Sequence, residues 1–278
     1  MLDREEYVEQ GYFYRTLSER LPQNMPLQEL LRQVKEEMLG STKLPMAIDF
    51  LRTELEHTGE FGSAMARLPH YFSPFQTYLV QEAENDRGRF DLRTALEILR
   101  AEAGYRAQEV SPQGLFLFQF EALCRNRLRY DPGLTAMSGD PVYDDDWRAW
   151  ILNVRHQIGL LDLADLLFIR SELFHERRQK RTGDSGEPKQ LVLFGAKEGG
   201  IALANRGKDP LYLFAALQRH LGYPEVPRPK PPDDTAQVIP QLKRRMERLE
   251  HRMKLIEEEQ REGIDITKFY RPHADSQG

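Results

Sequence analysis

Residues 73–91 read SPFQTYLVQEAENDRGRFD, and this stretch contains the clearest helix start in the chain. Ser73 stands before Pro74, and proline is best tolerated at the first position of a helix, while Gln76 completes a capping box with the serine. The pair Ser111 and Pro112 repeats this start before an apolar stretch that ends near residue 130. Both stretches therefore predict helices with well-defined N-termini.

Similar signals extend from this stretch in both directions. Asp3 and Glu6 form a capping-box pattern near the N-terminus, and Gly40 and Gly59 stand where helices would end. Apolar residues at helical spacing recur as far as residue 176, and they predict about eight helices joined by short loops. Such helices pack as antiparallel neighbours, so we predict a mainly all-α protein in which residues 1–222 form a multi-helix bundle or array.

The region after residue 174 departs from the helical pattern. Residues 175–189 carry several arginines and lysines, two glycines and a proline but no apolar side chain, which is typical of a mobile basic loop. Residues 191–194 and 201–203 are apolar and flank a glycine-containing turn, which predicts a small β-hairpin over residues 191–203. A last helix of the body then begins after Asp209 and ends at Gly222.

The C-terminal part of the chain has a different organisation. Five prolines within residues 223–234 predict a semi-rigid polyproline spacer. In residues 235–262 apolar side chains alternate at spacings of three and four, which is the seam of a coiled coil. The six seam residues are Ile239, Leu242, Met246, Leu249, Met253 and Ile256.

Charged residues beside the seam favour a parallel homodimer. Arg245 would face Glu250 of the partner subunit, and Arg252 would face Glu257 of the partner subunit. The alternative is an amphipathic helix that folds back on its own body, since only about three heptads are present. Residues 263–278 are polar and predict a flexible tail.

The composition argues against several classes of protein. The 278 residues carry a net charge of −5, which argues against nucleic acid as a general partner because phosphates are bound by clustered positive charge. The longest apolar stretch, residues 211–217, is far shorter than the roughly 20 residues that cross a bilayer, so we expect no membrane span. The acidic N-terminus is unlike a secretory signal and the single cysteine, Cys124, allows no internal disulfide, so we expect a cytoplasmic location.

Two Glu-x-x-His pairs, Glu54 with His57 and Glu172 with His175, are the candidate metal ligands. Carboxylate-bridged di-iron bundles use two such pairs because side chains three residues apart project from one face of a helix toward shared ions. Iron or manganese is the cofactor that this interpretation implies. This metal site is the alternative, and we expect no metal or cofactor, since both histidines stand near helix C-termini, where the helix dipole favours them without any ligand role.

A short arginine motif occurs twice, forty residues apart. Arg87 and Arg89 precede an aromatic residue and an aspartate, and Arg127 and Arg129 do the same. Paired arginines on one surface would bind an acidic or phosphorylated partner, so these four residues are the candidate binding residues. The alternative is that they are cations near helix C-termini followed by a capping aspartate.

No serine, cysteine or glycine-rich pattern in the sequence has the spacing of a known catalytic motif. We therefore expect a non-catalytic interaction or scaffolding protein, which docks a protein partner through its helical body and self-associates through the C-terminal coiled coil. The alternative function is a metal-dependent, di-iron carboxylate-like helical-bundle enzyme.

Overall fold

The computed structural model describes residues 2–23, 25–85, 90–108, 110–182 and 191–228, together with Met253. Over these residues it contains 13 α-helices, one short 3₁₀ helix and no β-strand, which confirms the all-α prediction. The chain divides into two units, Met1–Pro229 and Lys230–Gly278. Among the described helices, none is both long and apolar enough to cross a membrane.

The helices of the first unit follow one another with short connections. Their bounds are α1 Arg4–Arg20, η1 Leu21–Gln23, α2 Leu27–Lys35, α3 Leu44–Thr58, α4 Phe61–Ala66, α5 Pro74–Glu84, α6 Leu92–Arg106, α7 Pro112–Arg125, α8 Tyr130–Ser138, α9 Asp145–Gln157, α10 Leu163–Ile169, α11 Glu172–Thr182, α12 Ala196–Ala204 and α13 Pro210–Leu221.

Side-chain caps explain where several of these helices begin. Ser73 and Gln76 form the predicted capping box at α5, in which the backbone N–H of Gln76 donates to the serine Oγ over 3.4 Å. Asp91 and Asp144 accept backbone N–H groups at the starts of α6 and α9, over 2.8 and 2.9 Å. Each cap satisfies a donor that the first helical turn leaves without an intrahelical partner.

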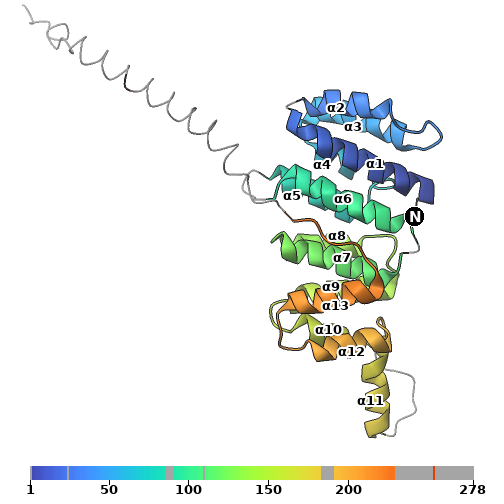
Figure 1. Cartoon of the computed structure of the whole chain (residues 1–278), viewed down its shortest axis with the longest axis vertical. Coiled ribbons are helices and arrows are strands. Elements are labelled where there is room, and N and C mark those ends of the chain that lie inside the picture. The colour runs from blue at the N-terminus through green and yellow to red at the C-terminus, as the bar shows by residue number, and fades with distance from the viewer. Residues whose placement is uncertain are drawn as a thin grey trace, which may run out of the picture. The chain divides into compact units, whose positions relative to one another are not determined.

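The helices of residues 2–228 stack as an array, with α2 and α3 at one end and α11 at the other (Figure 1). The chain does not simply proceed from one end to the other. Helix α1 packs along α6, and α13 returns to pack against α7 after the chain has passed through α8 to α12. Helices that are distant in sequence are therefore packed against each other in the middle of the array.

Buried and aromatic side chains of the core are concentrated around α7. Residues 114–123 of this helix are buried on every side, and the polar members of the stretch, Gln119 and Glu121, form hydrogen bonds. Phe116 packs on Trp150 with ring centroids 4.7 Å apart, and Phe194 packs edge-on against Trp147 and Trp150 at 5.3 Å. Residue 194 thus belongs to the aromatic core of the array.

The predicted β-hairpin over residues 191–203 is wrong. Residues 201–203 lie in α12, and Phe194 forms only an isolated bridge with Ser171. The glycines that indicated a turn serve helix packing instead, because a Cβ at Gly199 would overlap the side chain of Ser171. The sequence shows the glycines but not the close approach of α11 and α12 that requires one of them.

The predicted mobile loop over residues 175–189 is also wrong in its first half. Residues 175–182 continue α11, whose first turn is capped by the Oγ of Ser171, which accepts the Phe174 amide over 3.3 Å. A helix without apolar residues in its last two turns carries no periodic signal in the sequence. Residues 183–190 lie outside the described part of the chain.

The predicted spacer over residues 223–234 is wrong for residues 223–228, and residues 229–234 lie outside the described part of the chain. Tyr223 and Val226 are both buried, so residues 223–228 belong to the body of the array. Of the six predicted seam residues, only Met253 is described, and it is helical and exposed. The other five lie outside the described residues, so the coiled coil stays a prediction.

Candidate docking groove

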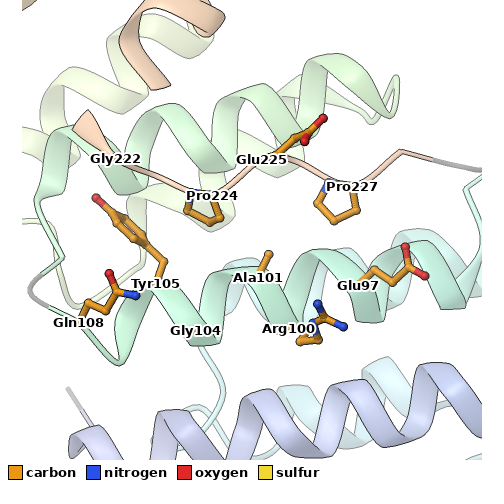
Figure 2. A pocket seen from close by; sticks show the side chains of 10 residues that line it. All are labelled: Glu97, Arg100, Ala101, Gly104, Tyr105, Gln108, Gly222, Pro224, Glu225 and Pro227. Atoms are coloured by element: carbon orange, nitrogen blue, oxygen red, sulfur yellow. The ribbon is translucent and has the colours of Figure 1, made fainter. Parts of the chain in front are cut away.

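A groove of about 650 Å³ runs between α6 and the extended segment that follows α13. We call this segment, residues 222–228, the strap. Figure 2 shows α6 along one side of the groove and the strap along the other. The lining residues are Glu97, Arg100, Ala101, Gly104, Tyr105 and Gln108 in and just after α6, and Gly222, Pro224, Glu225 and Pro227 in the strap.

Two buried side chains, together with hydrogen bonds from Tyr223 and Asn126, hold the strap on the array. The phenol of Tyr223 donates to Oε2 of Glu121 in α7 over 2.8 Å, and the amide of Asn126 donates to the Pro227 carbonyl over 3.3 Å. Burial raises the pKa of Tyr223, and the Glu121 charge raises it further, so the phenol stays protonated and able to donate. Tyr223 and Val226 are three residues apart, which is the repeat of a polyproline II helix.

Small residues keep the floor of the groove open. Gly104 lies in the last turn of α6, and glycine in a helix costs up to roughly 0.5–1 kcal/mol relative to alanine. A Cβ at this position would meet no described atom within 4 Å, so no packing constraint explains the glycine. Ala101, one helical turn earlier, continues this flat floor toward Arg100 and Glu97.

The strap also offers backbone hydrogen-bonding groups. The N–H groups of Glu225, Val226 and Arg228 donate to no group among the described residues. An extended peptide laid along such a segment gains main-chain hydrogen bonds as well as contacts to its side chains. The groove presents both signs of charge, from Glu97 and Arg100 on the α6 side and from Glu225 on the strap side.

A buried ionic cluster lies on a different face of α6. The guanidinium of Arg106 donates to Glu102 over 2.7 Å and to Asp140 over 3.2 Å, and Gln119 donates to the same Glu102 oxygen over 2.9 Å. All three charged side chains are almost fully buried. Burial raises the pKa of Glu102, and the nearby Asp140 charge adds to that effect while Arg106 opposes it. This cluster joins α6 to α7 and to the loop after α8.

The structure does not bring the two predicted metal-binding pairs together. Glu54 and His57 lie in α3, whereas Glu172 and His175 lie in α11, at opposite ends of the array (Figure 1). Glu54 pairs with Arg67, and Glu172 accepts the Ala196 amide over 3.1 Å. In the part of the chain that the structure describes, no three His, Cys, Asp or Glu residues are grouped to hold a metal ion. The shared di-iron site proposed from the sequence is therefore wrong.

Of the four arginines of the predicted site, the structure describes only those of the second copy of the motif, Arg127 and Arg129. Arg127 is exposed in a turn with φ +53°, and Arg129 precedes α8 and donates to Glu82 over 3.0 Å. Asp91, from the first copy of the motif, caps α6, and Asp131, from the second, lies 3.3 Å from Arg155. Arg87 and Arg89 lie outside the described residues, so the role of the four arginines in binding stays a prediction.

Comparison with known proteins identifies no relative of this chain. The chain matches no family model, no curated protein and no solved structure.

Proposed function

We propose that this chain is a non-catalytic docking protein whose groove between α6 and the strap binds an extended segment of a protein partner. The observation that carries the proposal is the open floor at Gly104 beside a strap whose Glu225, Val226 and Arg228 N–H groups donate to no described residue. A scaffold of packed helices supports the floor, and the strap is anchored by Tyr223 and Val226, so the groove needs little reorganisation to bind.

The dimensions of the groove support an extended peptide as its occupant. From Glu97 to Arg106, at the end of α6, the helix rises about 14 Å at 1.5 Å per residue, and Gln108 extends the groove beyond it. An extended chain covers that distance in about five residues. Pro224, Pro227 and Tyr105 supply apolar contacts, and the charges of Arg100 and Glu97 supply polar ones at the rim.

We also propose that the chain self-associates through the seam at residues 239–256. A parallel dimer would carry two grooves on one stem, and two linked sites raise the avidity for a partner that presents two segments. Support for this part comes from the spacing of the seam residues and the charge pattern beside them.

Selection of peptides on the full-length protein tests the groove. A random peptide library is selected on the wild type and on Gly104→Trp, which fills the groove from a position where a Cβ meets no described atom. Gly40→Trp is the matched control, because Gly40 is also exposed and open but lies outside the groove. Peptides enriched on the wild type and on the control but not on Gly104→Trp support the proposal. Equal enrichment on all three proteins, or none on the wild type, overturns it.

A further inference from the structure

Helix α11 extends past the packed part of the array at its end (Figure 1). Its first turn is anchored, since His175 is buried and Phe174 packs edge-on against Phe168 with ring centroids 5.4 Å apart. Residues 176–181, by contrast, are all exposed. The second half of the helix therefore presents its side chains to solvent.

Three cations share one face of this exposed half. Arg177, Lys180 and Arg181 follow the spacing i, i+3 and i+4, which places side chains on the same side of a helix. None of the three forms an ion pair with a described residue. Elsewhere on the array exposed cations commonly pair within the chain, as Arg32 does with Glu29 and Lys35 with Asp49.

Positive charge also lies near the buried His175 in the first turn of α11. Burial lowers the pKa of His175, and the charges of Arg178 and Arg170 lower it further. The protein as a whole carries a net charge of −5, so this concentration of positive charge runs against the overall balance. The helix dipole favours cations in a last turn, but it does not require three of them on one face.

We propose that the face of α11 formed by Arg177, Lys180 and Arg181 binds a carboxylate-rich segment of a protein partner. Arg177 and Arg181 are separated by about 6 Å along the helix axis, and alternate residues of an extended strand are separated by a similar distance. Acidic side chains at every second position would therefore meet both arginines. This site is separate from the groove and does not depend on the function proposed for it.

The chemistry of the face favours carboxylates over a nucleic acid. Residues 176–181 include no aromatic side chain on which a base could stack. The net negative charge of the chain also repels a long polyanion, whereas a short acidic segment meets mainly the local field. Arginine pairs with a carboxylate through two parallel hydrogen bonds, which gives such a contact a defined geometry.

Fluorescence anisotropy with the full-length protein tests this proposal. The probe is a labelled peptide of alternating glutamate and serine, and the variant is Arg177→Glu combined with Arg181→Glu. The control variant, Arg15→Glu combined with Arg148→Glu, changes the net charge equally at exposed residues that lie within ion-pair distance of Glu19 and Asp145. We expect the Kd to rise at least about tenfold in the first variant and little in the control, because the charge reversals replace two attractions to the peptide by two repulsions.

Three outcomes would overturn the proposal. The peptide fails to bind the wild type, the two double variants lose equal affinity, or a single-stranded oligonucleotide of equal charge binds more tightly than the peptide. The last result would identify α11 as a nucleic-acid contact. Circular dichroism of each variant confirms that the helical content is unchanged, so that a loss of binding is a loss of contact.

Discussion

The phenol of Tyr223 donates a 2.8 Å hydrogen bond to Glu121, and this bond joins the strap to the central helix α7 across 102 residues of sequence. Glu121 is buried and also pairs with Arg125 in the next turn. The strap is therefore part of the packed array, where it forms one side of the proposed groove.

Replacement of Tyr223 by phenylalanine should lower the free energy of unfolding by about 1–3 kcal/mol, because the buried Glu121 carboxylate loses a donor that nothing replaces. Urea denaturation measures this difference. Tyr212→Phe is the matched control, since Tyr212 is exposed and should change stability by less than about 0.5 kcal/mol. Equal stabilities of the two variants would mean that the strap is not held through Glu121.

The buried cluster around Arg106 predicts unequal effects of two substitutions. Arg106→Met should cost about 3–5 kcal/mol because it leaves the Glu102 and Asp140 carboxylates buried without a cation. Glu102→Gln keeps an acceptor for Arg106 and removes the excess negative charge, so it should cost far less at pH 7. Urea denaturation of both variants compares them, and a larger loss for Glu102→Gln would contradict the account.

The same cluster predicts a dependence on pH. The pKa of Glu102 is raised in the folded chain, so its contribution to stability is complete below the unfolded value of about 4.3 and is lost as the pH rises through the folded value. Glu102→Gln has no such group, so the stability of the variant relative to wild type should increase with pH over that interval. A difference that is constant with pH would show that Glu102 is ionised throughout.

Two glycines should respond to alanine in opposite ways. Gly104→Ala should raise the free energy of unfolding by about 0.5–1 kcal/mol, because it adds helix propensity where nothing crowds the new methyl group. Gly199→Ala should lower it, because the methyl group would overlap Ser171 at the contact of α11 with α12. Thermal unfolding of both variants distinguishes them, and stabilisation by Gly199→Ala would contradict the close approach of these helices.

Local sequence signals predicted the helices well where a cap or an apolar stripe is present. The Ser73 and Ser111 starts and the Gly59 and Gly222 ends all occur in the structure, since each depends only on neighbouring residues. The predictions that proved wrong depended on contacts between residues distant in the sequence. Phe194 and the glycines of α12 resembled a hairpin because the sequence does not reveal that Ser171 and Trp150 pack on them.

The groove was missed for the same reason. Gly104 in a helical stretch and the Tyr223–Val226 spacing are visible in the sequence, but only the return of α13 to α7 brings the strap beside α6. The Glu-x-x-His pairs show the converse error, because matching local spacing says nothing about whether α3 and α11 meet. Capping can be inferred from a few residues, whereas a site requires the tertiary arrangement.

The C-terminal seam predicts a dimer that depends on residues 239–256. Light scattering of the full-length protein should give a dimer, and Leu249→Lys should give a monomer because it places a charge in the seam. About three heptads with two methionines bury a modest area, so the dimer should dissociate on dilution. A monomer at tens of micromolar, or a dimer that persists in a chain ending near Pro232, would show that the seam packs on its own body instead.

The most direct test of the docking groove is the alkylation rate of a cysteine placed on its floor. Burial, chiefly, raises the pKa of the native Cys124 thiol to about 11, so it reacts slowly and leaves Gly104→Cys as the reactive site. Gly40→Cys reports the same chemistry away from the groove. A saturating peptide selected on the wild type should slow alkylation at position 104 by about tenfold or more and leave position 40 unchanged. Equal rates at position 104 with and without the peptide would place its binding site elsewhere and contradict the proposed function.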